Sequence, residues 1–451
     1  ADGSLGTFTT STVEIADRWG HSAVVANSYM YVFGGCAAGV NLGSCSDFEE
    51  TVQDLKIYNN NSGAPVSYTA HSDQTFAANT DRWGASSAVV DGYLYVAGGC
   101  VSATDCTDTT NNVQYAQISA ADGSVGTWAS TTSSLPADRA WGQLEVAGGS
   151  LYYIGGQSDT ATDERSEVYY ATPTGTGDVT TWATASNGLP GVRTQHSAAV
   201  WNDRIYVVGG LDGVAAATNT VYVSPGLSAG GNITSAWATD TDVPDIARSG
   251  HTVTAYANNL YVLGGYDGSN YLLDTQYAKI NSDGTLEPWA FSSSLPVALR
   301  QAEGFVANGY MYLVGGRSAA STCSTNTYVA PISSNTAIAS GNDPTGIGAW
   351  FKAPDEFSGA RYGAAVTHNE GKLYAMGGGC TAPLVADRHA FASLESQPQI
   401  AQYSYYIDAD TDIAPNKWLL NGTDEDDGAR WQFAYLSSTD ATNAWGQNTA
   451  F

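Results

Sequence analysis

A repeated combination of arginine, tyrosine and paired glycines runs through most of this chain and limits what it can fold into. Seven Gly-Gly dyads begin at Gly34, Gly98, Gly155, Gly209, Gly264, Gly315 and Gly377. A tyrosine stands three residues before every dyad, and an arginine stands 16 residues before it, or 15 in the sixth copy. Successive dyads are 51 to 64 residues apart, so the chain is predicted to fold as an array of similar units.

Each unit has the pattern of four short strands, which residues 248 to 289 show most completely. The arginines that open the units are Arg18, Arg82, Arg139, Arg193, Arg248, Arg300 and Arg361. Five units are preceded by a tryptophan 11 residues before the arginine, at Trp128, Trp182, Trp237, Trp289 and Trp350. Segments such as 93 to 99 are aromatic and β-branched up to the glycines, which is typical of a strand buried on both faces.

This pattern resembles the kelch-repeat β-propeller family, and the resemblance covers about residues 8 to 420. It implies an all-β fold, a seven-bladed kelch-type β-propeller with four antiparallel strands per blade. The blades would start near residues 18, 82, 139, 193, 248, 300 and 361. The repeat arginines, tyrosines and tryptophans are then expected to pack between blades with their polar ends hydrogen-bonded, and not to form a sevenfold active site. Propellers include enzymes, lectins and docking scaffolds, so the resemblance alone does not give a function.

Both ends of the chain carry strand-like segments beyond the seven units, and residues 1–451 are predicted to form a single propeller. Residues 1 to 8 resemble 121 to 128, the approach to a fourth strand, so we expect a mature or trimmed product. In the last blade, the third strand is expected at 399 to 407 and the fourth at Trp418. The tail, 421–451, is predicted to help close the ring, to form a reduced eighth blade or to contact a partner chain. Of these, a closed seven-bladed ring is favoured.

The charge balance excludes some partners. The chain has 44 acidic residues against 17 Lys and Arg, a net charge of −27. Seven of the 12 arginines belong to the repeat, so few cations remain for the outer surface. Nucleic acid and anionic membranes both require basic patches, so neither is an expected partner. The sequence has no apolar run of 18 residues, and membrane insertion is therefore not expected.

Six cysteines all follow a dyad, in the predicted loop between second and third strands. They are Cys36, Cys45, Cys100, Cys106, Cys323 and Cys380. Because the sixth and seventh blades would be neighbours in a ring, we expect the disulfides 36–45, 100–106 and 323–380. Zinc is the competing interpretation, although the sequence has no CxxC spacing. Disulfides indicate an oxidising compartment, so the protein is expected to be secreted, either extracellular or at the cell surface. The sequons at Asn60, Asn232 and Asn421 are candidate glycosylation sites.

One acidic run has the spacing of a metal site. Asp408, Asp410 and Asp412 alternate as calcium ligands do, but the run lacks the glycine and the distal glutamate of an EF-hand loop. A polar turn between third and fourth strands is the alternative. Calcium is the one cofactor that the sequence suggests.

Enzymatic kelch relatives provide a second set of candidates. Some are copper radical oxidases, which this chain does not resemble because its cysteines are assigned to disulfides and no His-His pair occurs. Others isomerise sialic acids with charged residues near the central channel, where Glu145, Glu303 and Asp203 are candidates. Glu303 is interpreted as replacing the histidine or small residue three places after the repeat arginine. No catalytic residue is assigned.

The sequence therefore predicts a non-enzymatic extracellular module that binds a protein or a glycan. Its binding face would be formed by the long loops 36 to 53, 100 to 112, 317 to 326 and 380 to 398, all between second and third strands. Two alternatives stay open. One is a subunit of an extracellular assembly or filament that contacts other chains through its termini. The other is a carbohydrate-active enzyme, a sugar isomerase or an oxidase-like protein, with its site in the central channel.

Overall fold

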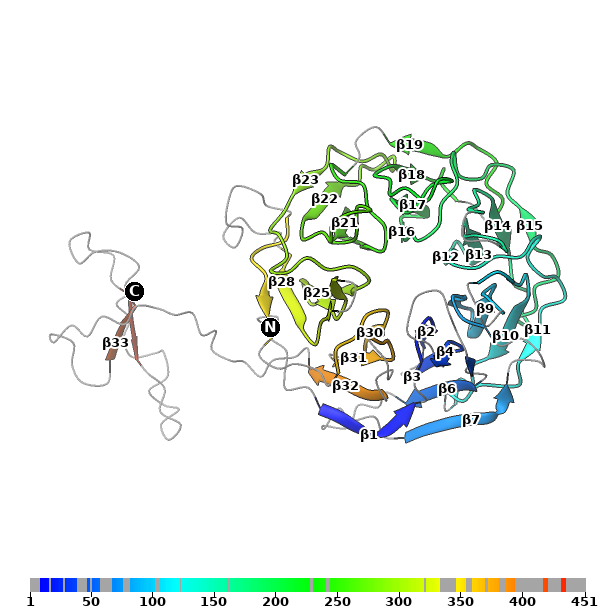
Figure 1. Ribbon diagram of the computed structural model, residues 1–451, viewed down its shortest axis with the longest axis horizontal. Coiled ribbons are helices and arrows are strands. Elements are labelled where there is room, and N and C mark those ends of the chain that lie inside the picture. Colours follow the sequence, from blue (N-terminus) through cyan, green and yellow to red (C-terminus); the bar gives the residue numbers. More distant parts are fainter. Residues whose placement is uncertain are drawn as a thin grey trace. The chain divides into compact units, whose positions relative to one another are not determined.

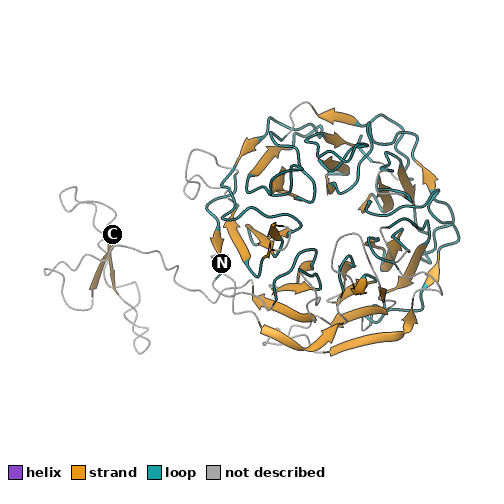
Figure 2. Cartoon of the chain, viewed as in Figure 1, coloured by secondary structure: helices purple, strands orange, loops and turns teal. Residues whose placement is uncertain are grey.

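The structure is a computed structural model, and it consists of two compact units. One unit is Gly3–Glu395, and the other combines Ala1–Asp2 with Ser396–Phe451; each is described by itself. The described residues are 9–15, 18–26, 29–38, 47–48, 51–56, 67–75, 82–101, 106–121, 123–159, 163–227, 230–240, 244–319, 322–332, 346–353, 359–369, 372–380, 387–393, 417–420 and 431–434. Within them every regular element is a β-strand (Figure 2).

The described strands of the larger unit form seven four-stranded antiparallel sheets. Sheet 1 contains β2 (Ser22–Ala26), β3 (Tyr29–Phe33), β6 (Thr51–Lys56) and β7 (Ser67–Thr75). Sheet 2 contains β8 (Ser86–Val90), β9 (Tyr93–Ala97), β10 (Val113–Gln117) and β11 (Ala129–Ser130). Sheet 3 contains β12 (Gln143–Ala147), β13 (Ser150–Ile154), β14 (Val168–Ala171) and β15 (Ala183–Thr184). Sheet 4 contains β16 (Ser197–Trp201), β17 (Arg204–Val208), β18 (Val221–Val223) and β19 (Ala238–Asp240).

The remaining three sheets follow the same order. Sheet 5 contains β20 (Thr252–Tyr256), β21 (Asn259–Leu263), β22 (Thr275–Lys279) and β23 (Ala290–Phe291). Sheet 6 contains β24 (Glu303–Ala307), β25 (Tyr310–Val314), β28 (Thr327–Pro331) and β29 (Phe351–Lys352). Sheet 7 contains β30 (Ala365–Asn369), β31 (Lys372–Met376), β32 (Asp387–Ser393) and β1 (Thr9–Ile15). Short hairpins pair β4 (Cys36–Ala38) with β5 (Asp47–Phe48), β26 (Arg317–Ala319) with β27 (Thr322–Cys323), and β33 (Lys417–Leu420) with β34 (Trp431–Ala434).

The seven sheets stand in a ring (Figure 1). The first strands of consecutive sheets contact one another in the order β2, β8, β12, β16, β20, β24 and β30. The circle is closed because β30 also contacts β2. Radial four-stranded sheets around a common centre are the arrangement of a β-propeller, as the repeats predict.

The seventh sheet differs from the sequence-based expectation. Its third strand is β32, which lies inside the segment 380 to 398 that was expected to be a loop, and its fourth strand is the N-terminal β1. Trp418 is not in this sheet, because β33 pairs with β34 instead. The segment 399 to 407 lies outside the described residues. The distance from the dyad indicates the position of the third strand correctly. β32 begins 10 residues after Gly377, and in sheet 5 the third strand, β22, begins 11 residues after Gly264.

The glycine dyads join neighbouring sheets at close range. The second glycine of each dyad donates its N–H to a carbonyl at the start of the next sheet, as from Gly35 to Arg82 at 2.9 Å and from Gly265 to Leu299 at 2.7 Å. The first glycine has a positive φ, for example +57° at Gly264. A Cβ at Gly264 would lie 2.5 Å from the carbonyl oxygen of Leu299, so only glycine allows this approach.

This contact can be separated from backbone strain by a matched pair of substitutions. Gly264 and Gly148 have nearly equal φ values, +57° and +56°, but a Cβ at Gly148 would contact nothing within 4 Å. We expect Gly148→Ala to lower the free energy of unfolding by about 1–2 kcal/mol through left-handed strain alone. Gly264→Ala should lower it by roughly 2–3 kcal/mol more, because overpacking is added. Equal losses in denaturant titrations of the two variants would contradict this account.

Candidate binding site at the dyad face

One face of the ring carries the loops that follow the dyads. Because the first and second strands of a sheet are antiparallel, the start of the first strand and the end of the second lie at the same end of the sheet. Backbone bridges join these points, as between Trp19 and Cys36 and between Ser249 and Tyr266. We call this end of the ring the dyad face. The hairpin turns between first and second strands lie at the opposite end.

The repeat arginines stabilise this face from inside. Arg18, Arg82, Arg248 and Arg361 are fully buried, and each donates from Nη1 to the carbonyl of the first dyad glycine of its own sheet at 2.8–3.1 Å. The repeat tyrosines act between sheets, as Tyr95 donates its hydroxyl to the carbonyl of Gly177 in sheet 3 at 2.6 Å. These contacts satisfy buried polar groups, as the repeat pattern predicts. The prediction holds only in part for the tryptophans, because Trp237 and Trp350 donate to backbone carbonyls whereas the buried Nε1 atoms of Trp182 and Trp289 have no acceptor among the described residues.

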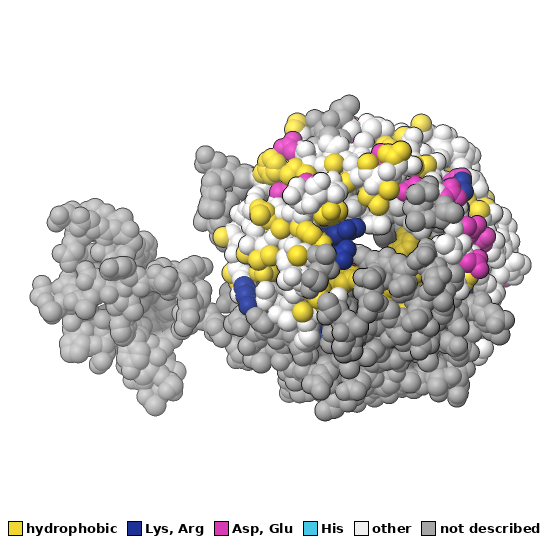
Figure 3. Space-filling view, viewed as in Figure 1, with side chains coloured by type: hydrophobic (Ala, Val, Ile, Leu, Met, Phe, Trp, Pro, Cys, Tyr) yellow, Lys and Arg dark blue, Asp and Glu magenta, His cyan; other side chains and the backbone are white. Residues whose placement is uncertain are grey.

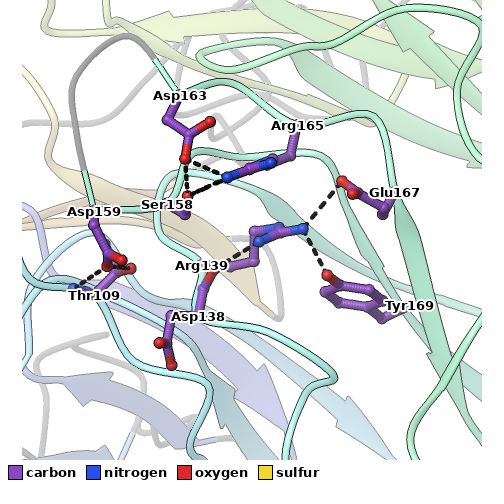
Figure 4. Close-up of polar contacts among 9 residues, drawn as sticks. All are labelled: Thr109, Asp138, Arg139, Ser158, Asp159, Asp163, Arg165, Glu167 and Tyr169. Carbon is purple, nitrogen blue, oxygen red and sulfur yellow. Dashed lines mark hydrogen bonds and ion pairs between the residues drawn. The ribbon is translucent and has the colours of Figure 1, made fainter.

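Arg139 shows a variation that places acidic side chains beside the face of sheets 2 and 3 (Figure 4). Its Nη2 donates to Glu167 at 3.0 Å and to the hydroxyl of Tyr169 at 2.5 Å. Nearby, Thr109 of sheet 2 donates to Asp159 of sheet 3 at 2.9 Å. Burial, followed by the charges of Asp159 and Asp108, raises the pKa of the Asp138 carboxyl. This arc of the face is acidic.

The sixth unit is shifted by one residue. Leu299, not Arg300, occupies the place of the buried repeat arginine, because its carbonyl accepts the N–H of Gly265 and it is 2% exposed. Arg300 therefore stands one place later, where Trp19 stands in sheet 1, and bridges to Arg317. The 15-residue spacing was the sequence signal of this shift.

The shift also corrects the interpretation of Glu303. The second dyad glycine packs on the residue three places after the arginine position, as Gly35 packs on His21, and Gly316 packs on Ala302 in the same way. Ala302, not Glu303, is thus the counterpart of the histidine. Glu303 instead begins β24, one residue further along. Counting from Arg300 gave the wrong equivalence because that arginine is itself displaced.

Arg300 and Arg317 form a cationic pair on the dyad face. Their backbones exchange two hydrogen bonds, from Arg300 N to Arg317 O at 3.0 Å and from Arg317 N to Arg300 O at 2.9 Å. Each guanidinium stacks on a tyrosine of a neighbouring sheet, Arg300 4.9 Å above Tyr266 and Arg317 4.8 Å above Tyr362. Burial, and then the charge of Arg317, lowers the pKa of Arg300. Cation–π stacking holds both side chains in place without neutralising them.

The pair has little other compensation within the described part of the chain. Arg300 donates from Nη2 to the side-chain oxygen of Gln195 at 2.9 Å, while Arg317 has no side-chain hydrogen bond there. The Nε atoms of both arginines are buried without an acceptor, and neither side chain has an ion pair with a described carboxylate. Basic side chains gather beside the central hollow in the view of Figure 3.

Aromatic side chains occupy the opposite arc of the face. Trp83 contacts Trp19 and Trp141 edge-to-face, with ring centroids 5.0 and 5.4 Å apart. This cluster packs on Cys36, Cys100 and Cys106. Beside it, a backbone hydrogen bond from Trp141 N to Gly84 O at 3.0 Å joins sheets 2 and 3. The face is therefore aromatic over sheets 1 to 3 and cationic at sheet 6.

Disulfides hold the loops of this face. Cys100–Cys106 closes the loop of sheet 2, and Cys323–Cys380 connects the loops of sheets 6 and 7, as the sequence predicts. Cys36 is also disulfide-bonded, and its predicted partner Cys45 lies outside the described residues. In β27, Cys323 pairs directly with Arg317 of β26. The second disulfide thus anchors the hairpin that carries one member of the arginine pair.

Comparison with known proteins agrees with this architecture. The model of the KLHDC2/KLHL20/DRC7 Kelch-repeats domain matches residues 4–210 and 144–378. The chain belongs to the kelch-repeat family. A solved structure titled "Structure of YjhT" is similar with a TM-score of 0.51 at 16% identity, over 72% of this chain and 97% of that one, which shows the fold alone. No curated protein matches the chain in sequence.

The three acidic residues considered for a site in the central channel lie in different parts of this kelch propeller. Glu145 lies on β12 and Glu303 on β24, both innermost strands, whereas Asp203 lies in the exposed hairpin turn between β16 and β17. Desolvation raises the pKa of the half-buried Glu145 to about 8, and it raises that of Glu303 to about 7 although the Glu303 residue is solvent-exposed. No charged group contributes to either shift, so the structure does not combine these carboxyls with an arginine. A cavity of about 270 Å³ near sheets 7, 1 and 2 is lined by Ala23, Val24, Val25, Met30, Val89 and Val366.

The remaining predicted sites are tested only in part. Asp408, Asp410, Asp412, Asn60 and Asn421 lie outside the described residues. The Asn232 amide donates to Ser186 Oγ at 3.2 Å, and its oxygen accepts the Ser186 N–H at 3.1 Å, so this side chain joins sheets 3 and 4. The described residues contain no cluster of three metal-ligating side chains and no helix long and apolar enough to cross a membrane.

Proposed function

We propose that this kelch propeller is a secreted module that binds a protein partner through its dyad face. The observation that carries the proposal is the position of the Cys323–Cys380 disulfide, which fixes the loops of two neighbouring sheets beside the stacked arginine pair. The kelch propeller fold favours a role in protein binding or as a scaffold. In such proteins the recognition residues usually lie on loops that a rigid scaffold holds in position. Disulfides favour an oxidising compartment, hence an extracellular or cell-surface location.

The carboxyls of the propeller centre support an enzyme less well. Glu145 lies on sheet 3 and Glu303 on sheet 6, so the two carboxyls are not on neighbouring sheets of the ring. The pKa of neither carboxyl is affected by an arginine. Catalytic acid–base pairs require groups within reach of one substrate. A glycan is the alternative ligand of the dyad face, because tyrosine rings such as Tyr266 and Tyr271, 5.3 Å apart, also suit sugars. Assembly through the termini stays a prediction.

The proposal can be tested by blocking one face at a time. Val214 is 81% exposed in the loop that follows the dyad of sheet 4, whereas Asp203 is exposed in a hairpin turn of the same sheet at the opposite end. Val214→Cys and Asp203→Cys, each coupled to a bulky polymer, provide matched variants. We expect the first to abolish capture of extracellular proteins by the immobilised propeller and the second to leave it unchanged.

A glycan array probed with the same two conjugates distinguishes the ligand classes. Sugar-specific binding that only the Val214 conjugate loses would assign a glycan ligand to the dyad face. If the Val214 conjugate still captures proteins and the Asp203 conjugate does not, binding lies on the opposite face and the proposal is overturned.

A further inference from the structure

We propose that Arg300 and Arg317 form a binding subsite for one compact oxyanion group, a carboxylate, sulfate or phosphate, carried by the ligand of the dyad face. This inference rests on the proposed function for the identity of the face. It names the chemistry that anchors a ligand there, which the repeat pattern does not supply.

The first argument is the unusual position of the two guanidinium groups. Like charges on directly bridged residues repel, and burial strengthens that repulsion. In the other sheets the same pair of positions holds uncharged residues, such as Trp19 with Cys36 and Ser249 with Tyr266. Nothing in the repeat requires arginine at these positions, since the buried arginine place of this unit is filled by Leu299. The pair therefore carries a cost that an anion would offset.

The second argument is the supply of free donors in fixed positions. Tyr266 and Tyr362 hold the two guanidinium planes by stacking. In the described part of the chain, Gln195 is the one hydrogen-bond acceptor that these side chains have, so the remaining Nη groups are the donors that a ligand can reach. Both Nε atoms are buried and have no acceptor there, so they offset none of the charge and are not themselves ligand contacts. Arginine forks match the two oxygens of a carboxylate, sulfate or phosphate. Preorganised donors in a partly desolvated site bind such a group more strongly than mobile surface lysines do.

The third argument limits the size of the anion. The chain as a whole carries a net charge of −27, and the same face is acidic around Asp138 and Asp159. A long polyanion would be repelled by the acidic side chains around the arginine pair, whereas one compact group can contact the two arginines without approaching those side chains. The ligand is thus expected to present a single acidic group, such as an acidic side chain or a sulfate or phosphate ester.

Simple ions test the subsite without knowledge of the ligand. Acetate, inorganic sulfate and inorganic phosphate would each be titrated into the full chain while the arginine Nε–Hε resonances are followed by NMR. Assignments come from Arg300→Gln and Arg317→Gln. We expect saturable shifts of these two resonances for at least one ion, and binding weakened at least about tenfold in either variant, because charge-assisted hydrogen bonds are lost. Binding of acetate alone would indicate a ligand with a carboxylate group, and binding of sulfate or phosphate would indicate a sulfate or phosphate ester.

Matched variants keep the test decisive. Lys279→Gln removes the same charge from an exposed side chain on sheet 5 that pairs with Glu287, and should leave ion binding unchanged. If Arg317→Gln fails to fold, Arg317→Lys keeps the charge but loses the planar fork, and should still bind several-fold more weakly. Unsaturable shifts, or equal affinities in the wild type and the arginine variants, would overturn the proposal. Because only ions are used, failure here leaves partner capture intact, and failed capture leaves ion binding intact.

Discussion

Acidification from pH 6.5 to 4.5 should destabilise the wild-type fold more than a His251→Ala variant, by about 2 kcal/mol. His196 and His251 are 4% and 8% exposed, and burial lowers the pKa of each from 6.5 to about 3. After burial, the charge of the neighbouring repeat arginine is the second cause of these low pKa values, Arg193 for His196 and Arg248 for His251. Between pH 6.5 and 3 the unfolded chain therefore binds protons that the folded chain does not, so stability falls as the pH falls.

The repeat itself indicates that alanine fits at this position. Ala302 takes the place of the histidine in sheet 6, packed on the second dyad glycine, so His251→Ala need not disturb the fold at pH 7. Denaturant titrations of the wild type, His196→Ala and His251→Ala across this pH range measure the difference. His368→Ala, which removes an exposed histidine stacked 4.9 Å from Phe305, should change the pH dependence far less. Parallel pH profiles for all four proteins would contradict the prediction.

The central carboxyls act in the opposite direction, which is why variants are compared rather than absolute stabilities. Desolvation in the ring centre raises the folded-state pKa of the half-buried Glu145 to about 8 and that of the exposed Glu303 to about 7, above the ordinary value of 4.5. The folded chain then holds protons that the unfolded chain releases, so these two groups favour folding as the pH falls from 8 to 4.5. They are present in every variant, and their contribution cancels in the comparison.

Removal of the Cys323–Cys380 disulfide should lower the free energy of unfolding by about 4 kcal/mol, and removal of Cys100–Cys106 by about 2 kcal/mol. The first closes a segment of 57 residues and the second a segment of 6, and a longer closed loop restricts the unfolded chain more. Calorimetry of the two paired Cys→Ser variants measures both values. Equal losses would contradict the loop-entropy explanation. The first pair of substitutions should also weaken ion binding at Arg317, whose hairpin contains Cys323.

The repeat made most of the fold predictable from sequence. The tyrosine and dyad located the second strand of all seven sheets, and the arginine located the first strand in every sheet but the sixth, where the count is displaced by one residue. The cysteine positions indicated two disulfides that the structure contains. The sequence-based prediction missed the arginine pair, although the 15-residue spacing of the sixth unit was a signal of the shift. Counting from Arg300 assumed that every repeat arginine is buried, whereas Leu299 fills that place in sheet 6. The buried arginine position and the position of Arg300 on the dyad face differ by one residue of register, and the composition of the unit does not reveal this difference.

The sequence by itself determined the kind of unit and its number of copies, because local strand patterns and glycine requirements repeat at each position. The tertiary structure decided how the units close and which side chains meet. β1 joins β32 across almost the whole chain length, and Gln195 of sheet 4 reaches Arg300 of sheet 6. Such contacts depend on the packing of distant segments around a common centre, and no local pattern in the sequence encodes that distance.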